Sequence, residues 1–131
     1  MIKQDYLIRM IQDFISRVAK AILDRKNIRQ QDWTEFDLLT QEVLGISVKE
    51  LTNMSMEQLV DRYDKEEDKM NRIEFASMYL LKLSEEIEED MVLKSKFRQD
   101  GIRLLKYVQK EDTNYSLQRE VLVHFLETNS K

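Results

Sequence analysis

Few side chains in this sequence have the type and spacing that metal chemistry requires. His124 is the only histidine, and Val121 stands three residues before it. Ferritin-like di-iron proteins need two Glu-x-x-His pairs that project into a helical bundle, so the sequence excludes that chemistry. An acidic cluster that would attract a divalent cation weakly comprises Glu85, Glu86, Glu88, Glu89 and Asp90. It lacks the glycine and the alternating oxygen ligands of a calcium loop, so we interpret it as a solvated helix end and predict no metal site.

Nucleophilic and nucleotide chemistry also lack the residues that they need. The chain has no cysteine, which excludes disulfides, thiolate zinc sites, iron–sulfur clusters and cysteine nucleophiles. No serine lies in a G-x-S-x-G elbow, and two glycines cannot supply a dinucleotide or phosphate-binding loop. The aromatic residues that could stack on a ligand are Trp33, Phe36, Tyr63, Tyr79, Tyr107 and Tyr115, and helical spacing favours core or cap positions for them. We therefore predict no catalytic residue, no cofactor and no enzymatic activity.

Charge and hydropathy bear on nucleic acids and membranes. The formal net charge is −4, whereas non-specific nucleic-acid binding is driven by basic residues that neutralise phosphates. The basic residues that do cluster are Lys94, Lys96, Arg98, Arg103 and Lys106, and acidic neighbours favour a solvated helix face there. The sequence contains no apolar run of the roughly eighteen residues that span a bilayer, and no signal-peptide pattern. We expect a cytoplasmic protein that binds neither nucleic acid nor membrane.

Composition favours a single all-α domain over residues 1–131. Proline is absent and glycine occurs twice, so the turn-rich loops of an all-β fold are not expected. Charged residues make up 35% and hydrophobic residues 42%, which is typical of a helical protein with a packed core.

The strongest periodic pattern lies between Asn71 and Gln109. The first half has an apolar stripe at Ile73, Ala76, Leu80, Leu83 and Ile87, and the second has one at Leu93, Phe97, Gly101, Leu104, Leu105 and Val108. These stripes predict two facing amphipathic helices, at 66–87 and 90–110, because each stripe must be buried against another element. The alternative to this break is one continuous helix over 66–110. Gly101 in the second stripe indicates a close approach of the partner helix, with a hinge as the alternative.

Three sequence patterns in the middle of the chain resemble capping boxes. An apolar residue precedes Ser or Thr, and an acceptor side chain follows three residues later, in Trp33-Thr34…Asp37, Ile46-Ser47…Glu50 and Met54-Ser55…Gln58. Such boxes satisfy the free amides of a first helical turn. They predict helices that begin near Glu35, Val48 and Met56. Gly45 should end the first of these helices, and the third should stop near Tyr63.

Helices are also expected at both ends. The first, over 5–25, has an apolar arc that covers about half of its circumference. It runs from Met10 and Phe14 through Leu7, Ile11 and Val18 to Ile8 and Ile15. One neighbour cannot cover such an arc, so we expect either two partner helices of the same chain or one helix and a second subunit. The last, over 117–127, should be capped by Ser116 and should bury Leu117, Val121, Leu122 and Phe125.

The chain resembles an uncharacterised bacterial family of small all-helical proteins with tetratricopeptide-like repeats. The resemblance rests on Met1-Ile2…Asp5-Tyr6-Leu7…Arg9-Met10-Ile11 and on Gly101-Ile102-Arg103-Leu104-Leu105-Lys106-Tyr107 with Tyr115-Ser116-Leu117. It implies an array of about six to seven helices that stack as antiparallel pairs. It implies no activity and no functional residue.

Two functions fit these observations. The first is a non-enzymatic helical protein-interaction module, with a protein partner or a second copy in a groove between helix pairs. The second is a small ligand-binding protein or enzyme with a pocket in the helical core. An exposed apolar groove would favour the first, and a cavity lined by several buried polar side chains would favour the second.

Overall fold

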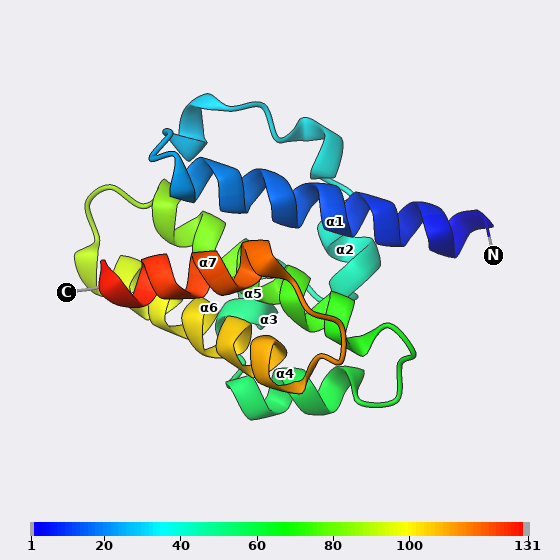
Figure 1. Cartoon of the computed structure of the whole chain (residues 1–131). Helices are drawn as coiled ribbons and strands as arrows, with labels where there is room; N and C mark the ends of the chain where they lie inside the picture. The colour runs from blue at the N-terminus through cyan, green and yellow to red at the C-terminus, as the bar shows by residue number, and fades with distance from the viewer. Residues whose placement is uncertain (1, 130–131) are drawn as a thin grey trace.

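The computed structural model describes residues 2–129, with side chains from residue 5 onward, so Met1 of the N-terminal motif lies outside the described residues. This part of the chain folds into α-helices and two 3-10 helices, at Ile28–Gln30 and Thr34–Phe36. The α-helices are α1 (Ile2–Leu23), α2 (Leu39–Leu44), α3 (Val48–Thr52), α4 (Met56–Tyr63), α5 (Lys69–Glu86), α6 (Met91–Glu111) and α7 (Leu117–Thr128). The predicted all-α array is confirmed: α5, α6 and α7 pack as successive antiparallel neighbours, and α1 lies alongside α5 and α7 (Figure 1). Within residues 2–129, no helix combines the length and the apolar character needed to cross a membrane.

The helix α5 lies at the centre of the core and packs against α1, α2, α4 and α6. The prediction of a single apolar stripe is wrong for this helix, because residues 73–78 are all buried, Glu74 and Ser77 included. Several neighbours cover the helix on different sides, so burial there does not follow the helical period. The helix also begins at Lys69 and not at residue 66, since the charged residues before it form turns.

The break between α5 and α6 is confirmed at Ile87–Asp90. The Asp90 side chain accepts a hydrogen bond from the amide of Leu93 and so caps α6. The Lys94 ammonium donates to the carbonyls of Ser84 and Ile87, at 2.6 and 3.3 Å, and so satisfies the end of α5. Two side chains at the start of α6 therefore stabilise the reversal without glycine or proline. Leu93 itself is exposed, so the predicted second stripe starts at Phe97.

The helix α1 begins earlier and ends earlier than the predicted range 5–25. Arg25 follows it with a positive φ of 56°, which stops the helix. The expectation of two partners within the chain is confirmed, because α1 packs against both α5 and α7. On the α7 side, Ile15 and Ala19 lie beside Leu122, and Gln118 contacts Ser16.

Two of the three capping boxes are confirmed. Ser47 and Ser55 each accept from the amide three residues later, and Glu50 and Gln58 each accept from the cap amide in return. These caps place the starts of α3 and α4 at Val48 and Met56, as predicted, and α4 ends at Tyr63.

The prediction of the first capping box, at Thr34, is wrong. The Thr34 hydroxyl donates to the Asp32 carboxylate at 2.5 Å, and the same carboxylate accepts from the Thr34 amide. A 3-10 turn results at Thr34–Phe36, and the α-helix begins only at Leu39. It ends at Gly45, as predicted, where a φ of 67° suits glycine.

We expect Ser47→Ala and Ser55→Ala each to lower the free energy of unfolding by about 0.5–2 kcal/mol, the usual cost of a lost N-cap. Urea denaturation followed by circular dichroism measures the loss. Ser95→Ala is the matched control, because Ser95 is exposed in the second turn of α6 and caps no helix. If the two cap variants unfold at the same urea concentration as the wild type, the caps contribute nothing to the fold.

The buried face of α7 differs from the prediction. Ser116 caps the helix as expected, but Leu117 and Val121 are exposed. The inward positions are Arg119, Leu122 and Leu126, at spacings of three and four. An arginine takes the first of these positions because Glu74 and Asp112 pair with it inside the protein.

Candidate functional site

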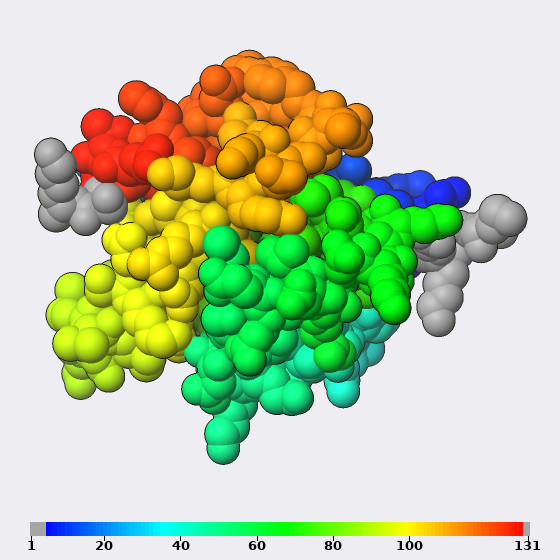
Figure 2. All heavy atoms as spheres, turned by 90° about the horizontal axis from the view of Figure 1, so that it is seen from below, coloured from blue at the N-terminus to red at the C-terminus, as the bar shows by residue number. Residues whose placement is uncertain are grey.

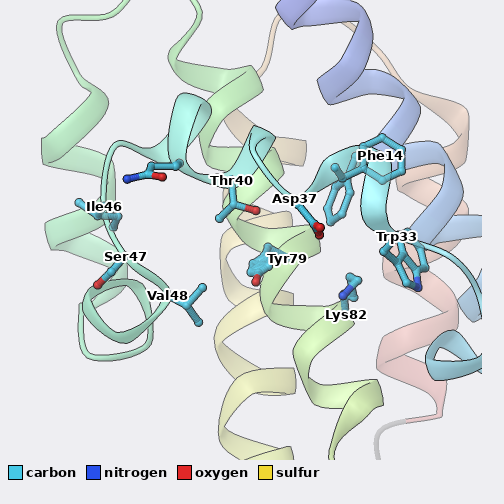
Figure 3. A pocket seen from close by; sticks show the side chains of 11 residues that line it. Phe14, Trp33, Asp37, Thr40, Ile46, Ser47, Val48, Tyr79 and Lys82 are labelled. Atoms are coloured by element: carbon cyan, nitrogen blue, oxygen red, sulfur yellow. The ribbon is translucent and has the colours of Figure 1, made fainter.

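The candidate site is a pocket of about 320 Å³ between α1, α2, α3 and α5 (Figure 3), which we call the aromatic pocket. Its lining comprises Phe14, Trp33, Phe36, Asp37, Thr40, Gln41, Ile46, Ser47, Val48, Tyr79 and Lys82. The volume lies at the lower end of the range of ligand pockets. It accommodates one large side chain or one small molecule.

Aromatic rings form one wall of the pocket. The ring of Phe14 lies 5.9 Å from that of Trp33, 5.3 Å from that of Phe36 and 4.7 Å from that of Phe75, between centroids. The indole Nε1–H of Trp33 donates to the carbonyl of Ile28 at 2.8 Å, which fixes the orientation of the ring. Aromatic contacts at these distances stabilise the wall beyond simple burial. The apolar surface of the pocket is therefore pre-formed.

A buried cation lies against this wall. Only 9% of Lys82 is exposed, and its ammonium lies 5.1 Å from the centroid of Trp33 and 5.8 Å from that of Tyr79. The ammonium is also paired with Glu86, one turn further along α5, at 2.7 Å. These partners explain how a lysine is tolerated in the core, because a desolvated charge needs both pairing and polarisable neighbours.

The guanidinium of Arg17 contacts the same aromatic wall. It lies 5.4 Å from the centroid of Trp33 and 5.8 Å from that of Phe36, and it pairs with Glu35. Arg17 and Lys82 thus both contact Trp33, so two cations lie against the aromatic rings before any ligand binds.

The polar side of the pocket comes from the start of α2 and from α5. Asp37 lies just before α2, Thr40 and Gln41 lie in its first turn, and all three line the pocket. Asp37 and Thr40 face Lys82 and Tyr79 of α5 (Figure 3). Burial raises the pKa of the Tyr79 hydroxyl, and a hydrogen bond with Thr40 partly offsets that increase. The hydroxyl therefore stays protonated near neutral pH and offers hydrogen bonding without charge.

The residues singled out for metal and acid–base chemistry do not meet in a site. His124 is exposed on α7. In the acidic cluster, Glu85 pairs with Arg98, Glu86 with Lys82 and Glu88 with Arg29. No three potential metal-ligating side chains gather within the part of the chain that the structure describes.

Three of the six aromatic residues considered as ligand contacts do come together. Trp33, Phe36 and Tyr79 line the aromatic pocket, whereas Tyr63 is a core residue whose hydroxyl donates to the carbonyl of Leu44 at 2.7 Å. Phe14 and Lys82 were missed by sequence reasoning. Phe14 was interpreted as core in the apolar arc of α1, and Lys82, which stands between Leu81 and Leu83, was not singled out.

Comparisons of the chain with the models of known protein families, with curated proteins and with solved structures each gave no match. The function is therefore argued from the geometry of the site alone.

Proposed function

We propose that this protein is a non-enzymatic interaction module that binds a protein partner by accepting an apolar or aromatic side chain in the aromatic pocket. The observation that carries the proposal is a pre-formed aromatic wall with exposed apolar residues at the rim. Val48 lines the pocket and is 39% exposed, and Leu38, next to Asp37 in the chain, is 73% exposed. Apolar residues exposed around a concave site are typical of protein-binding surfaces.

The charges in the pocket are consistent with an uncharged guest. The Lys82 ammonium is already paired with Glu86 and packed on two rings, so it offers little attraction to an anion. Asp37 in the lining would repel a carboxylate or phosphate. A partner side chain such as Leu, Phe or Tyr would pack on the aromatic wall, and the hydroxyls of Thr40 and Tyr79 would accommodate one polar atom of that side chain.

The alternative is a small ligand in the same pocket. It is favoured by the polar groups that converge there, namely Asp37, Thr40, Gln41 and Lys82. It differs from the main proposal in one testable respect, because a ligand enclosed by the pocket would not depend on the exposed rim. A second copy of the chain is the other form that a protein partner could take.

The test uses the rim of the pocket and the single tryptophan of the chain, Trp33. Proteins captured from the native host by the wild-type chain are identified by mass spectrometry, purified and titrated against it. Trp33 fluorescence should change on binding, since Trp33 forms part of the wall. Val48→Glu and Leu38→Glu should each weaken binding by about tenfold or more, because each places a charge in the interface.

The matched control is Val92→Glu, because Val92 is 83% exposed at the start of another helix. It should bind the partner like the wild type. Equal affinity of both rim variants would place the partner elsewhere and refute the proposal. A small aromatic compound that quenches Trp33 equally in wild type and rim variants, with no protein binding, would favour the alternative. Light scattering of the wild type alone would reveal a second copy as the partner.

A further inference from the structure

A second concave surface lies between α4 and α6. Two adjoining cavities of about 400 and 420 Å³ share Met56 and Arg103 in their walls. We call this surface the α4–α6 groove; it is formed mainly by Met54, Met56, Leu104, Tyr107, Arg103 and Lys110. In Figure 2, which looks onto this face, α4 in green lies beside α6 in yellow to orange. The helix α3 separates the two sites, since Val48 lines the aromatic pocket and Thr52 lines the groove.

The floor of the groove is apolar and adaptable. Met56 belongs to both cavities, Met54 and Leu104 line one of them, and Tyr107 lines the other. Methionine side chains are flexible and polarisable, so they adjust to the apolar face of an incoming helix. A groove of this kind receives a helix through apolar anchors spaced by three, four and seven residues.

The rim of the groove is basic. Lys96, Arg103, Lys106 and Lys110 follow one another on α6 at intervals of seven, three and four residues, so they share one helical face. Lys96 is paired with Asp100 at 2.9 Å, and Lys106 with Glu127 at 2.8 Å. The Arg103 guanidinium lies 3.9 Å from Asp100, and its side chain is 68% exposed. Lys110 is exposed at the far end of the groove. Arg103 and Lys110 are therefore the two charges best placed for a partner.

We propose that the α4–α6 groove binds an acidic amphipathic helix of a protein partner. Apolar side chains of that helix lie on Met56 and Tyr107, and its carboxylates pair with Arg103 and Lys110. This proposal goes beyond the function assigned to the aromatic pocket and does not depend on it. A polyanion without apolar groups fits less well, because the apolar floor with Met54, Met56 and Leu104 offers no contact to phosphates.

The probe is a fluorescein-labelled designed peptide of leucine and glutamate, with leucine on one helical face. A scrambled peptide of the same composition controls for charge alone, and a single-stranded oligodeoxynucleotide controls for polyanion binding. We expect the designed peptide to bind the wild type, measured by fluorescence anisotropy, with an affinity that falls at higher salt. Trp33 fluorescence should not change, because Trp33 lies in the other site.

Three variants and a matched control locate the contact. Arg103→Glu and Lys110→Glu should each weaken peptide binding by about tenfold. Met56→Gln should also weaken it, because it removes an apolar contact from the floor of the groove. Lys20→Glu should have no effect, because Lys20 is exposed on α1, away from the groove. Circular dichroism checks that each variant is folded.

Each remaining outcome overturns the proposal. Absence of peptide binding, or equal binding of the scrambled peptide, would show that the groove does not recognise an amphipathic helix. Tighter binding of the oligonucleotide, lost in the same variants, would assign the surface to nucleic acid. Self-association of the wild type that Arg103→Glu abolishes, measured by light scattering, would assign it to a second copy. A change in Trp33 fluorescence with unchanged affinity in the groove variants would place the peptide in the aromatic pocket.

Discussion

Replacing Arg119 by methionine should lower the free energy of unfolding by about 3–5 kcal/mol, because the carboxylates of Glu74 and Asp112 lose the buried cation that pairs with them. Only 5% of Arg119 is exposed. Its guanidinium donates to Glu74 at 3.2 Å, Asp112 at 3.3 Å and Gln109 at 2.7 Å, and to the carbonyl of Asn114 at 3.0 Å. One side chain thus joins α5, α6, the loop before α7 and α7 itself.

The loss should depend on pH through Glu74. Burial raises the pKa of the Glu74 carboxyl, and the charge of Arg119 and its hydrogen bond act in the opposite direction. Without Arg119 the pKa rises further, so the folded variant takes up a proton at higher pH than the unfolded chain does. Protonation removes the buried charge, and the destabilisation relative to wild type should therefore be largest at neutral pH and should shrink as the pH falls.

Urea denaturation of both proteins at several pH values measures this prediction. Adding Glu74→Gln to Arg119→Met should recover part of the stability at neutral pH, because the neutral amide costs less to bury. Arg103→Met, at an exposed position of α6, is the control and should change stability by no more than about 0.5 kcal/mol. A small loss of unfolding free energy in Arg119→Met, or a loss that grows at acidic pH, would show that Arg119 does not compensate the buried carboxylates.

Gly101→Leu should destabilise the fold by at least about 1–3 kcal/mol, because it overpacks the contact between α5 and α6. A Cβ at this position would lie 2.8 Å from Cγ of Leu81 and 3.1 Å from the carbonyl oxygen of Ser77. The Ser77 hydroxyl donates to the Gly101 carbonyl at 3.1 Å, so the two backbones are held together at this point. The close approach predicted from the sequence is confirmed.

Gly101→Ala provides the sharper comparison. In an open helix this change would stabilise by about 1 kcal/mol through helix propensity. Here the close contacts should outweigh that gain, and the alanine variant should melt at a lower temperature than the wild type. Gln99→Leu on the exposed side of α6 is the control for added bulk and should be close to neutral. An alanine variant more stable than the wild type would show that the contact relaxes at no cost.

Features that depend on a few consecutive residues could be predicted from the sequence. Ser47, Ser55 and Ser116 cap the helices that they were expected to cap, and Gly45 ends α2 with a positive φ. Caps and turns are satisfied by backbone groups within four residues, so their chemistry is complete in the local sequence. The first box failed for the same local reason, since Asp32 competed for the Thr34 hydroxyl.

The burial of polar residues could not be predicted in the same way. Apolar periodicity placed Leu117 and Val121 inside, whereas α7 buries Arg119. An arginine reaches an inward position only where distant carboxylates compensate its desolvation, and Glu74 lies 45 residues away in the chain.

Tertiary structure alone also assembled the aromatic pocket. Phe14, Trp33, Val48 and Lys82 come from four separate segments, and no local pattern predicts that they meet. The sequence by itself therefore determined the helical class, most helix ends and the close contact at Gly101, because these follow from local hydrogen bonding and a single periodic stripe. The packing of α1, α2 and α3 around α5 determined which side chains meet to form a site, because that depends on contacts between residues far apart in the chain.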